Sequence, residues 1–555
     1  MGVMTHAAPL TPPPPSKSKA DLEQVRALLR SLLAEGRNDE AIEVALSMLG
    51  QLQAHNADLA WQVLKLRREQ YGRRSERVDP AQLSLLLELA GPVAVDEESD
   101  RADTAAEDAA LIAERAAVEA GEPTAERGRA RRRRPSHALP REIIRHELPE
   151  SDRLCGGCGT AMPEIGVDVS ELVELVPAHF LVEEHHRVKY ACGRCKDAVR
   201  TAPGPVKLIE KGLPGPGLLA HVAMSKYQDA LPLNRLVEIY RRGGFETSVS
   251  TLCGWVAAVA AEVEPVVDRI REKALASFLA QTDGSGLKVL DRDDPEGIRR
   301  GTMWCLVGDR RYAVFLYARD GTGEEGPWRY LEGREGYLQA DAANIFDRLY
   351  NGDRARAVEV GCWAHARRRL HDLVESDARA AYPLQLIAQL YRIEDLADRR
   401  GSTLDQRLEL RRNRSRAIAD RYYRWIRRTL DGEPPSSALA RACAYSLNHW
   451  TALTRFLEEA RLPLDNNLCE LQIRSLAVGR RNYLFAGSDE GAERAAILYS
   501  LLRTCALHRI DTFAYLTDLL RKLARGWPQR RIDELLPENW HPAPAEPTPD
   551  APAPV

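Results

Sequence analysis

Residues 281–318, QTDGSGLKVLDRDDPEGIRRGTMWCLVGDRRYAVFLYA, contain three apolar segments separated by turn residues. Segment 281–291 predicts one strand, and segments 302–309 and 312–318 predict the two strands of a hairpin. From about residue 280, the sequence pattern is therefore that of an α/β domain.

The segments that follow continue this pattern. Residues 336–350 and 358–375 each predict a strand that runs into a helix. Residues 376–460 are almost wholly helical in pattern and rich in arginine, and residues 461–535 begin with an Asn/Asp turn. We expect an α/β domain that contains a long helical block.

Upstream, residues 206–275 predict two helical stretches. Gly243 and Gly244 separate them, and Ser248 or Ser250 is suited to cap the second. A helix–turn–helix DNA reader and an ordinary helical hairpin both fit this pattern.

The N-terminal region, residues 16–80, predicts a helix with a heptad seam. Asn56 occupies one core position of that seam, where a buried Asn would fix the register and favour a dimer. One amphipathic helix packed on its own domain explains the same pattern. The seam consists of Ile42, Ala45, Leu49, Leu52, Asn56, Leu59, Val63 and Leu66.

Between this helix and the cysteine-rich region, the charge changes sign along the chain. Residues 96–108 are acidic, whereas residues 127–134, RGRARRRR, are almost all arginine. No core is expected in either run, so we expect residues 81–138 to be a linker. Its arginines would either lie along DNA phosphates or form a solvated tether.

The composition of the 555-residue chain limits which classes of protein it can belong to. Lys and Arg number 78 and Asp and Glu 81, so contact with nucleic acid must come from local basic patches. The sequence has no run of 18 apolar residues and no N-terminal secretion signal, so we expect a cytoplasmic protein without a membrane span. Ten cysteines, four of them in Cys-x-x-Cys pairs, indicate metal binding in a reducing compartment.

The two Cys-x-x-Cys pairs supply four thiolates, which is the ligand set of a tetrahedral Zn²⁺ ion. Residues 159–191 between the pairs contain a strand-like stretch that would bring them together as a hairpin. A Cys₄ site leaves no open coordination position, so this zinc would be structural. The alternatives are redox cysteines, or His185 or His186 in place of one thiolate. The four cysteines are Cys155, Cys158, Cys192 and Cys195.

Three acidic residues are candidates for catalysis. Asp283 lies inside a predicted strand, Asp341 ends another, and Glu470 follows the turn LDNNLCE at the start of a helical stretch. Phosphoryl transfer by two metal ions needs carboxylates that converge on Mg²⁺, a hard cation that prefers oxygen ligands. These acids are far apart in sequence and can meet only through the fold; otherwise they are surface carboxylates.

The segment Cys362-Trp363-Ala364-His365 suggests a metal site, but two further ligands are missing. We therefore expect Cys362 and Trp363 to pack in the core. His365, with the arginines at 367–369, would face DNA or the acids. We expect the remaining cysteines to be buried apolar side chains: Cys253, Cys305, Cys443, Cys469 and Cys505.

From about residue 139 to 540, the sequence resembles the transposases of the insertion-sequence-66 family, which are bacterial DDE transposases. The strongest match is LDNNLCELQIRSLAVGRRNYLFAGSDEGAERAAILYSLLRTCALHRIDTFAYL, from residue 464. The other matching stretches in this range are LPGPGLLAHVAMSKYQDALPLNRLVEIYRRGG, STLCGWV, CWAHARRRLHDL and RIDELLPENW. Upstream of it, LRREQYGRRSER also resembles the family's segment after its leucine-zipper-like helix. The resemblance implies a zinc-finger-like domain at the cysteine pairs. It also implies an RNase H-like fold with a helical insertion, which residues 376–460 fit.

The resemblance also assigns roles to the three acids. Asp283 matches the first catalytic Asp, Asp341 the second, and Glu470 the Glu of the Asp-Asn-Asn-x-x-Glu motif. Many members have Asp-Glu-Thr at the first acid, where this chain has Asp-Gly-Ser, and Glu-Arg at the third, where it has Glu-Leu. The residues expected to contact DNA are Arg131, Arg132, Arg133, Arg134, Arg367, Arg368, Arg474, Arg480 and Arg481.

The function implied is that of an enzyme. It would bind the terminal inverted repeats of its element, cleave DNA with Mg²⁺ or Mn²⁺, and join the ends to target DNA. We expect it to work as a homodimer or higher oligomer at the bacterial nucleoid, with accessory proteins of the same element as further partners and without a membrane. The alternatives are a non-catalytic, zinc-containing DNA-binding regulator derived from a transposase, and a coiled-coil scaffold.

The expected fold class is multidomain: an N-terminal α-helical coiled coil, a zinc-binding module, a helical region and an α/β RNase H-like catalytic domain. The expected boundaries are 1–15 (disordered), 16–80 (zipper-like helix), 81–138 (linker), 139–205 (zinc module), 206–275 (helical, DNA-binding), 276–510 (catalytic, with the insertion at about 376–460), 511–540 (C-terminal segment) and 541–555 (disordered).

Overall fold

The computed structural model divides the chain into two units. Unit 1 comprises Met1–Thr104, Arg367–Ala388 and Arg421–Ala444, and unit 2 comprises Ala105–Ala366, Gln389–Asp420 and Tyr445–Val555. The structure describes single residues between 30 and 42 and then the ranges 95–121, 179–191, 199–210, 212–322, 324–351, 356–374 and 376–542. The predictions that fall outside the described residues are the disordered ends (1–15, and 541–555 from residue 543 onward), the zipper seam from Ala45 onward, the arginine run and the four cysteines of the pairs.

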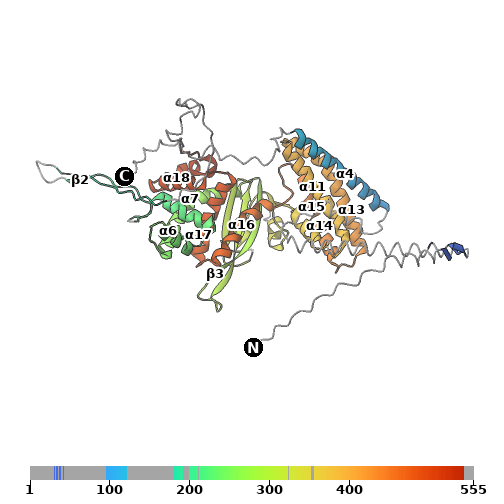
Figure 1. Cartoon of the computed structure of the whole chain (residues 1–555), viewed down its shortest axis with the longest axis horizontal. Helices are drawn as coiled ribbons and strands as arrows, with labels where there is room; N and C mark the ends of the chain where they lie inside the picture. The colour runs from blue at the N-terminus through green and yellow to red at the C-terminus, as the bar shows by residue number, and fades with distance from the viewer. Residues whose placement is uncertain are drawn as a thin grey trace, which may run out of the picture. The chain divides into compact units, whose positions relative to one another are not determined.

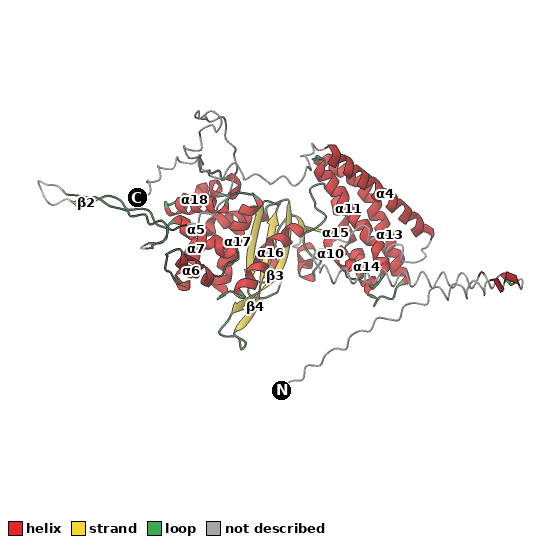
Figure 2. Ribbon diagram, viewed as in Figure 1, coloured by secondary structure: helices red, strands yellow, loops and turns green. Residues whose placement is uncertain are grey.

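A five-stranded sheet lies at the centre of unit 2 (Figure 2). Its order is β5-β4-β3-β6-β7, in which β3, β4 and β5 are antiparallel neighbours and β6 and β7 run parallel to β3. The strands predicted from residues 281–318 are confirmed as β3, β4 and β5. The strands are β3 Leu279–Leu290, β4 Ile298–Gly308, β5 Tyr312–Ala318, β6 Gly336–Gln339 and β7 Ala357–Val360.

The strand register depends on a glycine that directly follows a candidate acid. Gly284 is paired with Trp304 across β3 and β4. A Cβ atom at Gly284 would lie 2.7 Å from the Trp304 ring. A larger residue would displace either the indole or the strand, so the Asp-Gly-Ser sequence of this chain is matched to its own neighbour.

Helices cover this sheet and share one apolar core with it. In unit 2, α7 and α17 pack against β5, α5 and α18 pack against α7, and α16 lies on β3 (Figure 1). The helices are α5 Pro216–Tyr227, α6 Leu233–Arg242, α7 Val249–Leu275, α16 Asn467–Tyr483, α17 Asp489–Leu507 and α18 Thr512–Ala524. Residues 206–275 are therefore not separate from the α/β domain, because the apolar faces of α5 and α7 form part of its core.

The second helical stretch predicted in this region is α7, and its cap is Ser248. The Ser248 side chain accepts a hydrogen bond from the Thr251 backbone N–H, which satisfies one free donor of the first turn. In length and composition, α7 alone among the described helices is apolar enough to cross a membrane, which the sequence had not led us to expect. Its buried side chains, Val259, Val263 and Ile270 among them, belong to the core of unit 2.

Short elements follow β5. They are α8 Pro327–Leu331, the 3₁₀ turn η2 Asn344–Phe346, α9 Asp347–Tyr350 and α10 Trp363–His371. The two strand-then-helix segments predicted at 336–350 and 358–375 are confirmed by β6 with α9 and by β7 with α10.

The helical block predicted at 376–460 is confirmed. It comprises η3 Ala378–Ala380, α11 Ala381–Arg399, α12 Leu404–Leu410, the π-helical turn η4 Arg411–Ser415, α13 Arg416–Gly432, α14 Ala438–Asn448, α15 Trp450–Thr454 and η5 Arg455–Leu457. Arg411 in η4 is buried and donates to both carboxylate oxygens of Glu394 at 2.7 Å. It also donates to the backbone carbonyls of Phe456, Glu459 and Leu462, so one guanidinium joins three segments.

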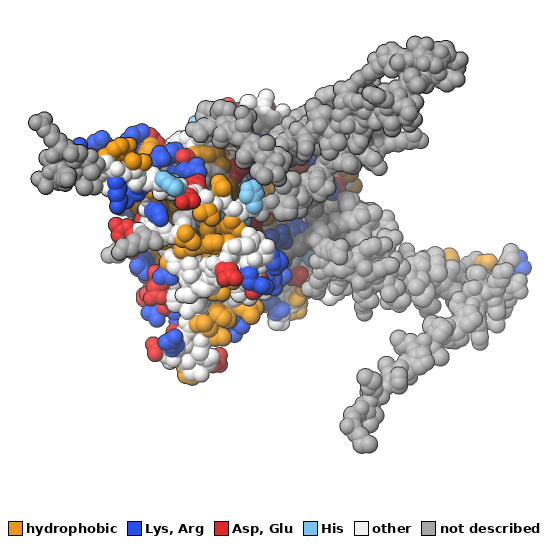
Figure 3. All heavy atoms as spheres, turned by 60° about the vertical axis from the view of Figure 1, so that its left-hand side comes forward, with side chains coloured by type: hydrophobic (Ala, Val, Ile, Leu, Met, Phe, Trp, Pro, Cys, Tyr) orange, Lys and Arg blue, Asp and Glu red, His pale blue; other side chains and the backbone are white. Residues whose placement is uncertain are grey.

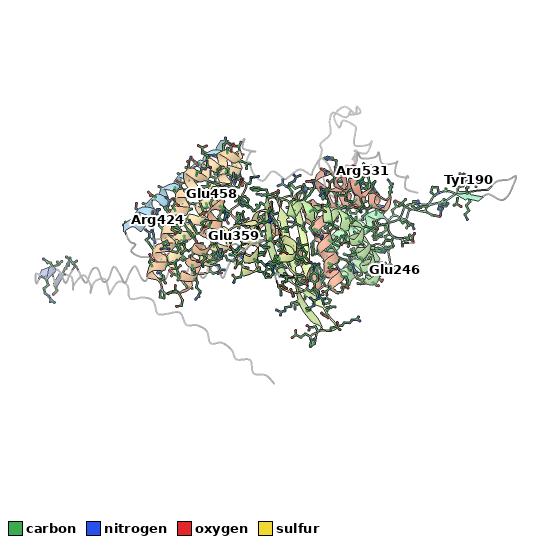
Figure 4. All side chains as sticks on the ribbon, turned by 180° about the vertical axis from the view of Figure 1, so that it is seen from behind. Tyr190, Glu246, Glu359, Arg424, Glu458 and Arg531 are labelled. Atoms are coloured by element: carbon green, nitrogen blue, oxygen red, sulfur yellow. The ribbon has the colours of Figure 1, made fainter. Side chains whose placement is uncertain are left out.

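The expected linker at 81–138 differs from the structure in its acidic part. Residues Val95–Gly121 form a helix, α4. In unit 1, Asp100 is buried and accepts hydrogen bonds from Arg424 (2.6 Å; Figure 4) and Arg428 (3.2 Å). Buried Thr104, one turn further on, lies 3.3 Å from the Tyr382 hydroxyl.

The part of α4 that belongs to unit 2 also forms ion pairs with arginines of that unit. Glu107 and Glu114 each pair with Arg414 at 2.6 Å, and Asp108 pairs with Arg392. We expected a linker because the acidic run has few apolar residues. The helix instead buries a narrow stripe of side chains, and arginines from distant helices neutralise its carboxylates.

A small antiparallel pair lies near the expected zinc module. β1 (Lys189–Ala191) pairs with β2 (Val199–Thr201). We expected the hairpin within residues 159–191, between the two cysteine pairs. In the described part of that stretch, 179–191, the last three residues form a strand, β1, and its partner β2 lies beyond the second pair. The pairing instead encloses residues 192–198, which carry the second cysteine pair.

The C-terminal segment of unit 2 closes the core. The last elements are η6 Gln529–Leu535 and η7 Pro537–Asn539. Glu538 accepts hydrogen bonds from Lys273 of α7 and from the Tyr312 hydroxyl at the start of β5, both at 2.6 Å. Residues 511–540 are therefore tied to the α/β domain rather than independent of it.

Candidate active site

The parallel pairing of β3 with β6 places two of the candidate acids at equivalent positions. Gln281 of β3 is the register partner of Gln339 of β6. Asp283 and Asp341 each follow two residues later, and β6 ends at Gln339. Both carboxylates therefore lie level with the C-terminal end of β6, Asp341 just beyond that strand and Asp283 inside the longer β3. The C-terminal ends of parallel strands are where sites form in α/β sheets.

Two buried glutamines hold the third acid's loop at this end of the sheet. The Gln281 side-chain amide donates to the Gln339 side-chain oxygen at 2.8 Å and to the Asp465 carbonyl at 2.9 Å. The Gln339 amide donates to the Gly361 carbonyl at 2.9 Å and to the Pro463 carbonyl at 3.3 Å. The loop that precedes α16 is thus bonded to both acid-bearing strands.

The start of α16 is hydrogen-bonded to the residue before Asp283 on β3 and to the residue opposite Asp283 on β4. Asn466 donates its side-chain amide to the Thr282 carbonyl at 2.8 Å. Cys469 donates its thiol to the carbonyl of Cys305, the register partner of Asp283 across β4, at 3.4 Å. Glu470 follows directly and is half-buried. These contacts bring all three acids to one region of unit 2.

The described residues contain no group of three or more His, Cys, Asp or Glu side chains arranged as a metal-ligand set. The acids are gathered by the fold without forming a closed cluster. One oxygen in this region is also unsatisfied, because Asn466 Oδ1 is buried without a hydrogen-bond partner.

The Cys-Trp-Ala-His segment contributes a histidine to this region and is otherwise structural. Cys362 and Trp363 are buried, as expected, and the Trp363 indole donates to the Leu453 carbonyl at 2.8 Å. Burial raises the pKa of the Cys362 thiol to about 12, which keeps it protonated and a poor metal ligand. His365 Nε2 lies 3.8 Å from Glu470 Oε1, so this histidine faces an acid.

Asp465 belongs to the turn before α16 and shapes that turn. Its carboxylate accepts from the Asn467 backbone N–H at 3.1 Å, from the Asn467 side-chain amide at 2.6 Å and from the Tyr391 hydroxyl at 2.7 Å. An aspartate engaged in this way orients the chain.

The arginines predicted to contact DNA are placed in different ways. Arg480 of α16 donates to Ser285 Oγ at 3.0 Å and to the Gly286 carbonyl, on the same strand as Asp283. Arg474 and Arg481 of α16 are exposed. Arg367 and Arg368 follow His365 in α10 and belong to unit 1. In the view of Figure 3, basic and acidic side chains are interspersed over the described surface.

Sequence reasoning missed the glutamines, although the sequence contains a signal for them. Both acids are preceded by the same pattern, Gln-Thr-Asp at 281–283 and Gln-Ala-Asp at 339–341. Alternate residues of a strand share a face, so the pattern sets a buried amide beside each acid. The expectation for the cysteines was wrong at one position. Cys253 on α7 is exposed, whereas Cys305, Cys443, Cys469 and Cys505 are buried.

Comparison with known families covers most of the chain. The family described as "Transposase IS66 family" matches residues 211–494. The "zinc-finger binding domain of transposase IS66" matches 152–196, which include all four cysteines of the two pairs. The "IS66 C-terminal element" matches 500–537, and the "Transposase C of IS166 homeodomain" matches 58–144.

Similar full-length proteins occur in Sinorhizobium fredii. The uncharacterized protein y4qI is 32% identical over 552 residues, which cover 94% of this chain and 97% of that protein. The uncharacterized protein y4hP is 31% identical over 506 residues, which cover 87% of this chain and 88% of that protein. No solved structure matches the chain.

Proposed function

This chain belongs to the IS66 transposase family, and on that premise we propose that it is a DNA transposase that cleaves the ends of its element and joins them to target DNA. The observation that carries the proposal is the paired Gln-x-Asp pattern of β3 and β6 with the start of α16 bonded to it. Terminal inverted repeats and target DNA are its proposed substrates, in the bacterial cytoplasm at the nucleoid.

The topology supports an RNase H-like catalytic domain. Three antiparallel strands are followed by two strands parallel to the first, and the acids occur on the first strand, after the fourth strand and on a helix beyond the helical block. In this arrangement the helical block is an insertion that separates Glu470 from Asp341 in the sequence. Hydrogen bonds from Gln281 and Gln339 to the loop before α16 hold the start of that helix, and with it Glu470, beside the sheet.

The residues fit a hard divalent cation. Asp283, Asp341 and Glu470 offer carboxylate oxygens, which Mg²⁺ and Mn²⁺ prefer, and the unsatisfied Asn466 Oδ1 is a fourth oxygen in the same region. When bound there, such ions would activate a water or a 3′-hydroxyl and stabilise the leaving oxygen. Of the chain's own residues, the buried glutamines orient the loop, His365 faces Glu470, and the α16 arginines bind phosphate.

The remaining assignments follow from the family domains. We assign a structural Zn²⁺ to the four cysteines of the two pairs, in the matched segment 152–196. DNA binding is shared between that module and the basic residues, and the N-terminal seam would join two or more protomers so that both DNA ends are held together. Accessory proteins of the element are further proposed partners.

A second candidate function is a DNA-binding regulator without catalysis. It is favoured by the absence of a three-ligand cluster among the described residues and by the Asp-Gly-Ser and Glu-Leu sequences at two acids. The two functions differ in one measurement, which is the cleavage of a labelled duplex carrying the element's terminal repeat. A transposase nicks it with Mg²⁺ or Mn²⁺ and not when both are left out, whereas a regulator binds it in both conditions and never nicks it.

A further inference from the structure

A cavity of about 320 Å³ lies in unit 2 between α5, α7, the C-terminal end of α16 and the first turns of α17. This volume is within the range of pockets that hold small organic ligands. Two cations and three aromatic rings contribute to its lining, and its wall also includes Leu287 of β3. The cations are Lys226 and Arg494, and the rings belong to Tyr227, Tyr483 and Phe485.

Neither cation forms an ion pair with a carboxylate among the described residues of unit 2. The charge of Arg494 acts on Glu490, one turn earlier in α17, and helps to lower its pKa, but the two side chains are not joined by a salt bridge. The Lys226 ammonium instead lies 5.4 Å from the Tyr227 ring centre and 5.7 Å from that of Tyr483. Burial lowers the pKa of Lys226, so an anion in the cavity would favour its charged form. The nearby Asp489 carboxylate is engaged by Tyr317 at 2.6 Å and by Arg299.

A strained turn lies between two aromatic residues of the wall. Leu484, the residue that caps the C-terminus of α16, has φ of +65°, a conformation that L residues rarely adopt. Leu484 is 63% exposed, and the next residue, Phe485, which lines the cavity, is 39% exposed. Two backbone hydrogen bonds, Leu290 N–H to the Ala486 carbonyl and Ala486 N–H to the Lys288 carbonyl, fix the segment against β3. Strain that is kept in place by surrounding contacts, beside exposed apolar groups, is typical of a binding site.

The cavity and the first acid of the candidate active site lie along one face of β3. Asp283, Ser285 and Leu287 alternate along β3 and so share a face. Leu287 lines the cavity, and Arg480 donates to Ser285 between the acid and the cavity. The separation of Asp283 and Leu287 is roughly 13 Å at the usual rise of a strand. A DNA strand whose phosphate lies at the acids would therefore reach the cavity within a few nucleotides.

We infer that this cavity binds one unpaired nucleotide of the DNA strand that is processed at the acids, with its base against the aromatic wall and its phosphate beside Lys226 and Arg494. The inference rests on the proposed function, because it takes DNA as the substrate. Aromatic side chains with nearby cations are the usual surface for an unstacked base and its phosphate. A free mononucleotide has the same chemistry, but the strand face that leads from Asp283 favours a nucleotide within a DNA chain.

A glycine in the cavity wall provides a matched pair of variants. Gly491 lies in the first turn of α17, and a Cβ atom there would meet only Ser488 Oγ, at 3.5 Å, which is an ordinary contact. Gly491→Ala therefore leaves the cavity open, whereas Gly491→Leu fills it without a backbone clash. Lys226→Met removes a cation of the cavity and keeps a side chain of similar length. Equal thermal midpoints of unfolding for these variants and the wild type would establish that each is folded.

The experiment uses the full chain without added Mg²⁺ or Mn²⁺, so that the zinc is kept, and two duplexes that differ only in one 2-aminopurine, paired in the first and unpaired in the second. Fluorescence anisotropy gives the affinity for each. We expect the wild type and Gly491→Ala to prefer the unpaired duplex by about tenfold, the scale of one base stacked on aromatic side chains. Gly491→Leu and Lys226→Met should lose most of that preference.

Three results would overturn the inference: no preference in the wild type, an undiminished preference in Gly491→Leu, or competition by free deoxyadenosine monophosphate as strong as that by the unpaired duplex. The last would make the cavity a mononucleotide site. Because the binding test contains no Mg²⁺ or Mn²⁺ and needs no catalysis, Asp283→Asn should keep the preference. A chain that shows the preference but never nicks DNA would refute the proposed function alone.

Discussion

Gln281 donates its side-chain amide to the side-chain oxygen of Gln339 at 2.8 Å, and the two residues are direct partners in the parallel pairing of β3 and β6. Each glutamine also holds a carbonyl of the loop at 463–465. The pair therefore links the two strands that carry Asp283 and Asp341 to the loop that leads to Glu470.

The first prediction concerns the three acids. Asp283→Asn, Asp341→Asn and Glu470→Gln should each abolish metal-dependent nicking, because an amide keeps the shape of the carboxylate and removes the charge that holds a cation. Binding of the terminal-repeat duplex should stay the same or tighten slightly. Nicking and gel-shift assays on one duplex measure both. Glu458→Gln, an exposed position (Figure 4), is the matched control. A variant that nicks at the wild-type rate would remove its residue from the site.

The second prediction concerns the glutamine pair. Gln339→Leu should lower the free energy of unfolding by about 1–3 kcal/mol, because it leaves the buried Gln281 amide and two carbonyls with fewer partners. It should also slow nicking, since the loop before Glu470 loses a contact. Urea unfolding and nicking rates check both effects. Exposed Gln529→Leu is the control, and an equal effect of both variants would contradict the structural role.

The third prediction concerns Arg411, a buried cation with five hydrogen bonds. Arg411→Leu should destabilise the protein by about 3–5 kcal/mol, because the Glu394 carboxylate would lose its bidentate partner. Arg411→Lys should recover only part of this, since an ammonium cannot reproduce the planar fork. Exposed Arg412→Lys should be neutral. Chemical unfolding is the measurement, and full recovery by lysine would show that charge alone matters.

The fourth prediction concerns the pH dependence of stability at Glu538. Burial raises the pKa of this carboxyl, but hydrogen bonds from Lys273 and Tyr312 and the charge of Arg311 outweigh it, so the pKa is lowered overall. A lowered pKa in the folded state means that the stabilisation is complete above the unfolded value, about 4.3, and is lost as pH falls through the folded value. The difference in unfolding free energy between wild type and Glu538→Gln should therefore be largest near neutral pH and shrink at acid pH. Glu534→Gln, at the exposed pair with Arg531, should show little difference at any pH.

The fifth prediction concerns zinc. The purified protein should contain zinc near one equivalent, and Cys155→Ser with Cys158→Ser should remove the metal and the folding of the module at 139–205. Elemental analysis with limited proteolysis checks both outcomes. Cys253→Ser, at an exposed cysteine outside the pairs, should change neither. Protein without bound zinc, or a double variant that keeps it, would contradict the site.

The parts of the fold that neighbouring residues in the sequence determine could be predicted. The strands of 281–318 were marked by alternating apolar runs, α7 by its serine cap, and the burial of Cys362 and Trp363 by the lack of further ligands. The acids were found by resemblance, but their convergence depends on the pairing of Gln281 with Gln339, a contact across the fold.

Other parts depend on contacts that a linear reading cannot supply. The acidic run of α4 is helical because Arg392, Arg414 and Arg424 come from distant segments. The membership of α5 and α7 in the sheet's core is fixed by β5 and α17. The exposure of Cys253 follows from the face of α7 that this core leaves free.

The closure of the sheet by late elements has a consequence for synthesis on the ribosome. The apolar strand β5 ends at Ala318, and the helix that covers it, α17, ends at Leu507. Roughly 190 residues separate them. At ordinary translation rates, α17 is therefore complete on the order of 10–40 s after β5 has been synthesised. The Glu538 contacts with α7 and β5 come later still. The nascent chain thus presents an unfinished apolar sheet for about a third of its elongation, and we expect its yield in cells to depend on chaperones that shield such surfaces during translation.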